Sequence, residues 1–557
     1  MRWKSVLPAI LVAAGLAVVT SMAVTSPVQN LNPPNVGGPV ADDLLPKAQE
    51  VDQLLVAQLS ASGLTPAGKA DDLTVLRRLS LALLGTIPSL QEIRRFEADT
   101  RPDRLTIWTN VILADTRFNE YFAERLARAY VGIEGGQFPI YRRDRFTNWI
   151  SQQLKDQTPY DQMVRRLIAE EGIPTDKAAV NFAVAGYANE DFDPNKLAGR
   201  TVRAFLGQRI DCAQCHDHPF DHWKQTEFEG LAASFGQLDL YPVGVIDNPD
   251  KKYEVVDEKA IATNEDGQTP KMRTVEPSVP FSPECYPSQG TPRERLAEWV
   301  THPSNKRFER AIANRVWGLL FGQPYLSDLQ PADRPVDDLP DPEDPQFKDS
   351  TAVLNLLGAD FRSHGCDLRR LIQVITSTEA YRRSSQHSSP DPQQLEQAER
   401  LWGVFPLSRL RPEQVIGAML QSNSVKTIDQ NSHLFSRAFR FFKERDYVNE
   451  FGDPGEAELE QRTATIPQTL LNMNGEFARE MSQTGLFATP GTLRRFSPTN
   501  EALLDNAFLT CLTRRPTEAE RKHFQGQLSE RPKDADDAVL EDLFWTLYNC
   551  EEFTWNH

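Results

Sequence analysis

The sequence predicts a mainly α-helical protein, in which two helical domains are joined by a small β-containing insert. Apolar residues recur at three- and four-residue spacing through most of the chain, and capping boxes mark several helix starts. Alternating apolar patterns are confined to one short region. Hydrophobic residues make up 40% of the 557 residues, which is enough to build cores in a chain long enough for two or three domains.

The N-terminal segment has the pattern of an export signal. Arg2 and Lys4 precede an apolar run from Val6 to Val19. We predict a signal peptide or N-terminal anchor over residues 1–23 and a proline-rich linker over residues 24–41. The protein is therefore expected to be exported, in the periplasm or outside the cell, and to meet a membrane only through an uncleaved N-terminal segment.

The first predicted helical domain covers residues 42–238. Gly85 is expected to end one helix in a left-handed cap. Capping boxes at Ser89–Glu92 and Thr226–Glu229 are expected to start two others, because in each a hydroxyl and a carboxylate can satisfy backbone N–H groups. The helix predicted over Pro194–Gln208 and the helix predicted to start at Thr226 flank the part of the chain that concentrates cysteine and histidine residues.

The predicted insert covers residues 239–290, and the second helical domain covers residues 291–557. The runs Tyr253–Val256 and Met272–Val275 predict a β-hairpin in the insert. A capping box at Thr291–Glu294 marks the start of the second domain. The acidic loop between Pro324 and Pro345 lacks the regular spacing of a calcium-binding loop, so we interpret it as solvated.

One motif concentrates the chemistry of the sequence. Cys212, Cys215 and His216 form Cys-x-x-Cys-His, the attachment sequence of c-type haem. In such sites the two thiols form thioethers with the haem, and the imidazole is the proximal ligand of the haem iron. Covalent haem attachment also agrees with export, since stable cysteine modification belongs outside the cytoplasm.

The same residues have other interpretations. Cys212, Cys215, His216 and His218 could bind zinc or another divalent metal, which accepts cysteine and histidine ligands in tetrahedral geometry. His222 follows closely and adds a further candidate ligand. The two cysteines could instead form a disulfide or remain a dithiol in a structural turn.

Several side chains outside the motif have conditional roles. His216 and His218, with Asp217 and Asp221 nearby, could belong to a metal-dependent hydrolase. Met272 is a candidate sixth ligand of a haem iron, although an ordinary strand residue is the simpler interpretation.

Two arginines precede the motif. Arg200 and Arg203 could pair with haem propionates, or they could lie on the exposed face of the helix that leads into the motif.

The charge of the chain limits its partners. The formal net charge is −17, which disfavours nucleic acid and anionic membrane surfaces, because both require a basic face. An exported redox protein is an expected partner.

Matching segments across nearly the whole mature chain resemble planctomycete-type exported proteins that pair a cytochrome-c-like domain of unknown function with a second domain of unknown function. The resemblance implies export and this two-domain architecture, with a suspected role in polysaccharide use, and it does not define a reaction. Cys212, Cys215, His216 and His218 match the family motif, whereas His222 does not. The other matching segments include Leu76–Leu81, Pro159–Asp161, Phe205–Gly207, Thr291–Arg293, Asn314–Trp317, Leu320–Gly322 and Phe544–Trp545.

These observations favour an exported redox protein that carries haem c. The alternatives are a metal-dependent enzyme acting on extracellular carbohydrate, and a scaffold or binding protein with a structural Cys/His turn. The sequence does not decide whether the chain is an enzyme.

Overall fold

The computed structural model confirms the mainly helical prediction, with strands only in short two-stranded sheets among the residues described. It describes residues 41–133, 141–188, 191–218, 222–241, 244–257, 271–326, 338–387, 391–429, 432, 448, 476–485, 488–530 and 536–557. The predicted signal segment and most of the linker lie outside these residues.

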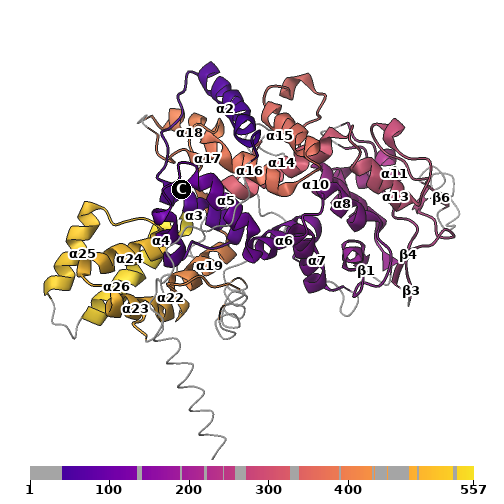
Figure 1. Cartoon of the computed structure of the whole chain (residues 1–557). Helices are drawn as coiled ribbons and strands as arrows, with labels where there is room; N and C mark the ends of the chain where they lie inside the picture. Colours follow the sequence, from indigo (N-terminus) through magenta and orange to yellow (C-terminus); the bar gives the residue numbers. More distant parts are fainter. Residues whose placement is uncertain are drawn as a thin grey trace, which may run out of the picture.

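Helices dominate both halves of the chain (Figure 1). Those before the insert are α2 (Leu44–Ala61), α3 (Asp72–Leu84), α4 (Leu90–Ala98), α5 (Arg104–Ala114), α6 (Thr116–Val131), α7 (Arg143–Lys155), α8 (Tyr160–Ala169), α9 (Asn181–Val184), α10 (Pro194–Leu206) and α11 (Gln225–Ala233). Those after it are α13 (Pro292–Val300), α14 (Lys306–Phe321), α15 (Ala352–Ser363), α16 (Leu368–Ser377), α17 (Glu379–Arg382), α18 (Pro392–Arg400), α19 (Pro412–Ser422), α22 (Glu476–Ser482), α23 (Thr489–Phe496), α24 (Asn500–Leu512), α25 (Glu518–Glu530), α26 (Asp536–Asn549) and α27 (Glu551–Thr554). Short 3₁₀ turns are η1 (Ala178–Val180), η2 (Asp211–Gln214), η3 (Pro283–Cys285) and η4 (Pro345–Phe347).

The strands form four antiparallel pairs. The pairs are β1 (Tyr187–Ala188) with β2 (Asp191–Phe192), β3 (Leu238–Tyr241) with β4 (Gly244–Asp247), β5 (Glu254–Val256) with β6 (Met272–Thr274), and β7 (Ser408–Arg409) with β8 (Trp555–Asn556). The β5–β6 pair confirms the predicted hairpin in the insert, whose connecting segment lies outside the described residues. The β7–β8 pair joins the C-terminus to a segment about 150 residues earlier, which sequence patterns did not predict.

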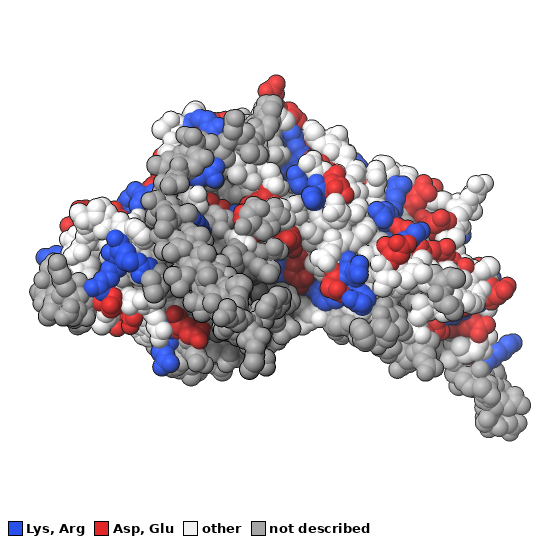
Figure 2. Space-filling view, turned by 60° about the horizontal axis from the view of Figure 1, so that its bottom comes forward, with Lys and Arg blue, Asp and Glu red and all other residues white. Residues whose placement is uncertain are grey.

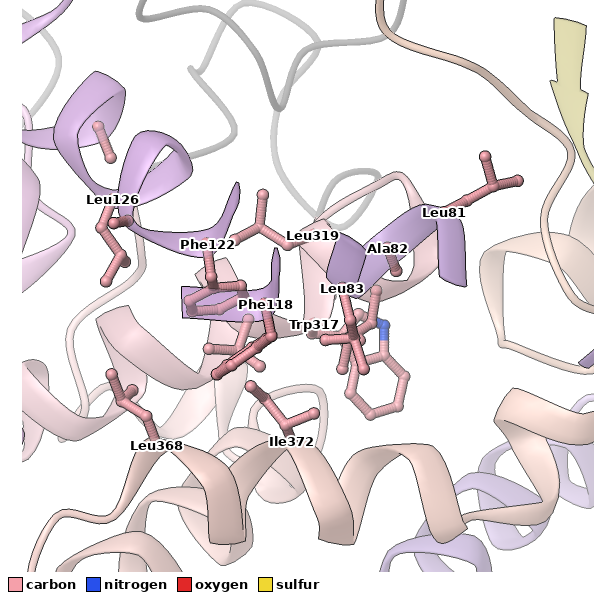
Figure 3. Packing of buried hydrophobic residues seen from close by; sticks show 14 of the residues in the cluster. Leu81, Ala82, Leu83, Phe118, Phe122, Leu126, Trp317, Leu319, Leu368 and Ile372 are labelled. Atoms are coloured by element: carbon pink, nitrogen blue, oxygen red, sulfur yellow. The ribbon is translucent and has the colours of Figure 1, made fainter. Parts of the chain in front are cut away.

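The two helical regions share one hydrophobic core. Figure 3 shows side chains of α3, α6, α14 and α16 meeting in it, among them Leu83, Phe118, Trp317 and Ile372. All four of these side chains are fully buried. The helices before and after the insert therefore stabilise each other.

Two buried arginines on α3 connect the halves further. Arg77 donates to the carbonyl oxygens of Cys511 and Phe553, at 3.1 and 3.2 Å. Arg78 donates to three more carbonyl oxygens and lies 3.6 Å from the ring centre of Phe405. Because a guanidinium has five N–H donors in a fixed fork, each arginine can hold several chain segments at once. Figure 1 shows α3 beside the end of the chain.

Local capping signals explain where several helices begin and end. The capping boxes Ser89–Glu92 and Thr291–Glu294 form as predicted. Gly85 ends α3 with φ of 66°, in the predicted left-handed conformation.

The predicted Thr226–Glu229 box is wrong. Helix α11 begins at Gln225, and Glu227 accepts from the backbone N–H of Lys224 at 2.8 Å. Glu229 forms an ion pair with Arg273 of β6 instead, so its carboxylate is used between elements and not at the helix start.

Figure 2 shows acidic and basic side chains interspersed over the described part of one face. Within the described ranges, we find no helix with the length and apolar character needed to cross a membrane.

Candidate functional site

Helix α10 delivers the chain to the Cys-x-x-Cys-His turn. Its N-terminus is fixed by Pro194 at the first helical position and by Asp193, whose side chain accepts from the N–H groups of Asn195 and Lys196. It ends at Gly207, whose φ of 60° turns the chain in the left-handed region. The turn therefore follows a rigid, buried helix.

The 3₁₀ turn η2 presents both thiols on the surface. Cys212 lies within η2 and Cys215 directly follows it, and both side chains are exposed free thiols. Between them Ala213 is fully buried. Asp211 sits over Gly199 of α10, where a Cβ atom would overlap its carboxylate. Ala213 and Asp211 thus pack the turn against the body of the protein, while both sulfur atoms are exposed to solvent.

His216 is oriented by a backbone carbonyl group. Its Nδ1 lies 2.7 Å from the carbonyl oxygen of Asp217, and the ring is exposed. An Nδ1–H that donates to this oxygen leaves Nε2 with its lone pair, which is the form of histidine that binds a metal.

Asp217 joins this turn to the next helix. Its carboxylate accepts from the backbone N–H of Gln225 and from Lys224 Nζ, each at 3.0 Å. These two hydrogen bonds lower the pKa of Asp217. The ionised carboxylate therefore holds the motif against the start of α11.

Trp223 is hydrogen-bonded to the segment that directly follows the motif. Its carbonyl oxygen accepts from the backbone N–H of His218 at 2.8 Å, and its buried ring packs against His222 with ring centres 4.2 Å apart. It also contacts Phe281 of the insert. The exposed motif is consequently attached to a buried aromatic residue.

The four residues of the alternative metal site do not converge. Among the described residues, only Asp43, Asp360 and His364 form a group of three or more His, Cys, Asp or Glu side chains with ligand atoms close enough for one ion. Asp43 and Asp360 are both bound to Arg370, so this group is an ion-pair network. Cys212, Cys215, His216 and His218 thus surround no common point in this conformation.

The other predicted ligands have mixed outcomes. Arg200 is buried and donates to the carbonyl oxygens of Ala185 and Val131, at 2.8 and 3.4 Å, so the prediction of an exposed Arg200 is wrong, whereas its pairing with a haem propionate stays a prediction. Met272 lies on β6 with its side chain half exposed, and its role as a sixth ligand stays a prediction. Asp221 lies outside the described residues.

Sequence reasoning missed a cavity beside the motif. It has a volume of about 390 Å³ and lies between the helical regions. Its lining consists of Gln208, His222, Pro340, Asp341, Glu343, Asp344 and Phe347.

Part of the acidic loop forms one wall of this cavity, and it is not merely solvated as predicted. This part of the loop is hydrogen-bonded to the segment before the motif. The N–H of Leu339 donates to the carbonyl oxygen of Gly207, and Gln208 Nε2 donates to the carbonyl oxygen of Leu339. Only the spatial meeting of segments more than 100 residues apart creates this cavity.

The structure and the motif together define a two-part helical protein with an exposed Cys-x-x-Cys-His turn. Residues 50–239 match the family described as PSCyt2, a protein of unknown function (DUF1549), and residues 292–528 match PSD1, a protein of unknown function (DUF1553). The chain belongs to the planctomycete-type proteins that combine these two domains. No curated protein and no solved structure matches it.

Proposed function

We propose that the chain is an exported redox protein that carries a c-type haem on Cys212, Cys215 and His216. The observation that supports this most directly is the arrangement of the turn. Two exposed thiols lie on one fixed turn, and the next residue is a histidine whose Nδ1 is bonded to a carbonyl group. This donor set fits two thioethers and one axial nitrogen ligand.

Each residue would have a separate role. Cys212 and Cys215 would bind the haem covalently, and His216 would hold the iron through Nε2. Asp217 would fix the imidazole through its carbonyl oxygen and anchor the turn through its carboxylate. The bound haem would supply reversible one-electron chemistry.

The rest of the chain supports a role beyond simple electron carriage. A carrier needs about 100 residues, one ordinary domain, whereas the helices here continue far beyond the motif. An exported redox partner or a polysaccharide is the proposed partner of this larger body, and the N-terminal pattern supports a location outside the cytoplasm.

The test is expression with the native N-terminus in a host that attaches haem to exported proteins. Haem should remain on the chain after denaturation and give the spectrum of a c-type pyridine haemochrome. Cys212→Ser and Cys215→Ser should each leave at most one attachment, and His216→Ala should prevent normal ligation. Cys285→Ser is the matched control, because this half-buried cysteine lies outside the motif.

The same preparation separates the alternatives. A colourless protein that releases one zinc ion on denaturation, and for which His218→Ala is as damaging as His216→Ala, would support the metal site instead. A colourless and metal-free protein would contradict both cofactors and leave a structural turn.

A further inference from the structure

Arg310, on the first turns of α14, has an unusual environment. Its side chain is 1% exposed, and none of its three guanidinium nitrogen atoms has a hydrogen-bond partner within the described chain. Burial lowers the pKa of Arg310 to about 10, so the group still carries its charge at neutral pH. A buried charge without a bonded counter-charge is strongly destabilising, even after the protein relaxes.

The other buried arginines show what is missing. Arg78, equally buried, donates to three carbonyl oxygens between 2.7 and 2.9 Å. Arg293 is also fully buried and forms a 2.6 Å ion pair with Asp247. Water could accept from a single N–H of Arg310, but it would not neutralise the guanidinium. An anion would supply the bonded counter-charge that Arg310 lacks within the described chain.

Two residues of the cavity beside the motif lie close enough to this guanidinium to act on it electrostatically. Asp341 and Glu343 line the cavity, and their charges act on Arg310. Both already have cationic partners, since Asp341 binds Arg307 at 2.7 Å and Glu343 lies 3.4 Å from Lys306. Arg310 alone among these three basic residues lacks a bonded partner in the described structure.

We propose that Arg310 anchors an oxyanion-binding site between the two domains, which takes the carboxylate, sulfate or phosphate group of a small acidic molecule. The planar guanidinium can donate two parallel hydrogen bonds to such a group. Because Asp341 and Glu343 are already paired with other cations, the counter-charge of Arg310 would come from a ligand.

The experiment is calorimetric titration of the full chain with inorganic phosphate, sulfate and acetate at fixed ionic strength. The wild-type protein should bind at least one of them, and Arg310→Met should weaken binding by about tenfold or more. Lys306→Met is the matched control, because it removes a charge from the same turn but from an exposed side chain. The anion affinity of Lys306→Met should stay within about twofold of the wild-type affinity.

Stability gives an independent readout. Without added anion, Arg310→Met should be at least as stable as wild type, because an apolar side chain replaces an uncompensated buried charge. Severe unfolding of this variant would show that the guanidinium is already bound within the chain, and would overturn the proposal. So would unchanged anion affinity in Arg310→Met, or failure of all three anions to bind the wild-type protein.

Two sources could supply the same chemistry: a free acidic molecule, or a carboxylate of a haem attached nearby. Phosphate binding should be compared in haem-loaded and haem-free protein. Loss of phosphate binding on loading assigns the site to a haem carboxylate, and retained binding assigns it to a free acid. The oxyanion site itself does not rest on the haem proposal, since the haem-free protein tests it alone.

Discussion

The junction between the helical regions and the Cys-x-x-Cys-His turn are built in opposite ways. At the junction, fully buried side chains pack together, and Arg77 and Arg78 hold distant carbonyl groups. At the turn, the thiols and His216 are exposed, and a few hydrogen bonds fix the backbone. Reactive groups are thus placed where they contribute little to stability, and the junction provides the rigidity that positions them.

Removing Arg78 should break the junction and give the largest effect. Arg78→Met would leave the carbonyl oxygens of Tyr381, Arg383 and His557 without this donor. Each buried unpaired group costs about 1–3 kcal/mol, so we expect a loss of about 5 kcal/mol in the free energy of unfolding. Urea denaturation of the variant and of wild type measures this loss in the free energy of unfolding. Arg400→Met is the control, because Arg400 is exposed and pairs with Glu396 across one helical turn.

The ion pair of Glu413 and Arg125 should give the next largest effect. Burial alone would raise the pKa of Glu413, but the charges of Arg125, Arg128 and Arg411, with a hydrogen bond from a backbone N–H, together outweigh burial and lower the pKa from 4.5 to about 2. The pair's contribution should therefore be complete above pH 4.5 and be lost as the pH falls towards 2.

Glu413→Gln tests this pH dependence. The variant should lose about 3 kcal/mol at pH 7, because Arg125 stays buried without its carboxylate. Its stability should also change less than that of wild type between pH 4.5 and 2. Equal slopes in that interval would show that Glu413 is not the responsible group.

The close approach of α3 and α19 gives a smaller effect. A Cβ atom at Gly417 would overlap the carbonyl oxygen of Gly85, so Gly417→Ala should cost about 2 kcal/mol by forcing the helices apart. Gly526→Ala is a control of opposite sign. Nothing lies within 4 Å of a Cβ atom at Gly526, and alanine in a helix should stabilise by about 0.5–1 kcal/mol. Thermal unfolding of both variants measures the difference.

The sequence predicted features that depend on neighbouring residues. Ser89 caps a helix with Glu92, and Gly85 ends α3 with φ of 66°, because both signals act within one helical turn. The error at Thr226 has a tertiary cause instead. Glu227 stands three residues after Lys224, as Glu229 does after Thr226, and only the tertiary pairing of Glu229 with Arg273 separates the two patterns.

The site could be predicted only in part. The motif located its chemistry, but the cavity depends on Gly207 meeting Leu339 across more than 100 residues. The environment of Arg310 is equally non-local, because an arginine on a buried helix has the same sequence pattern whether its charge is paired or not. Long-range pairing therefore determines the features that sequence patterns missed.

The smallest expected effect on stability is at the motif itself. The haem-free double variant Cys212→Ser, Cys215→Ser should unfold within about 0.5 kcal/mol of haem-free wild type, because exposed side chains without buried contacts contribute little. The same double change should abolish covalent haem attachment in a competent host. Both the stability of the haem-free protein and covalent haem attachment must be measured, because together they show whether the thiols serve haem binding without stabilising the fold. A loss of several kcal/mol in the haem-free protein would contradict it and show that the thiols hold the turn together.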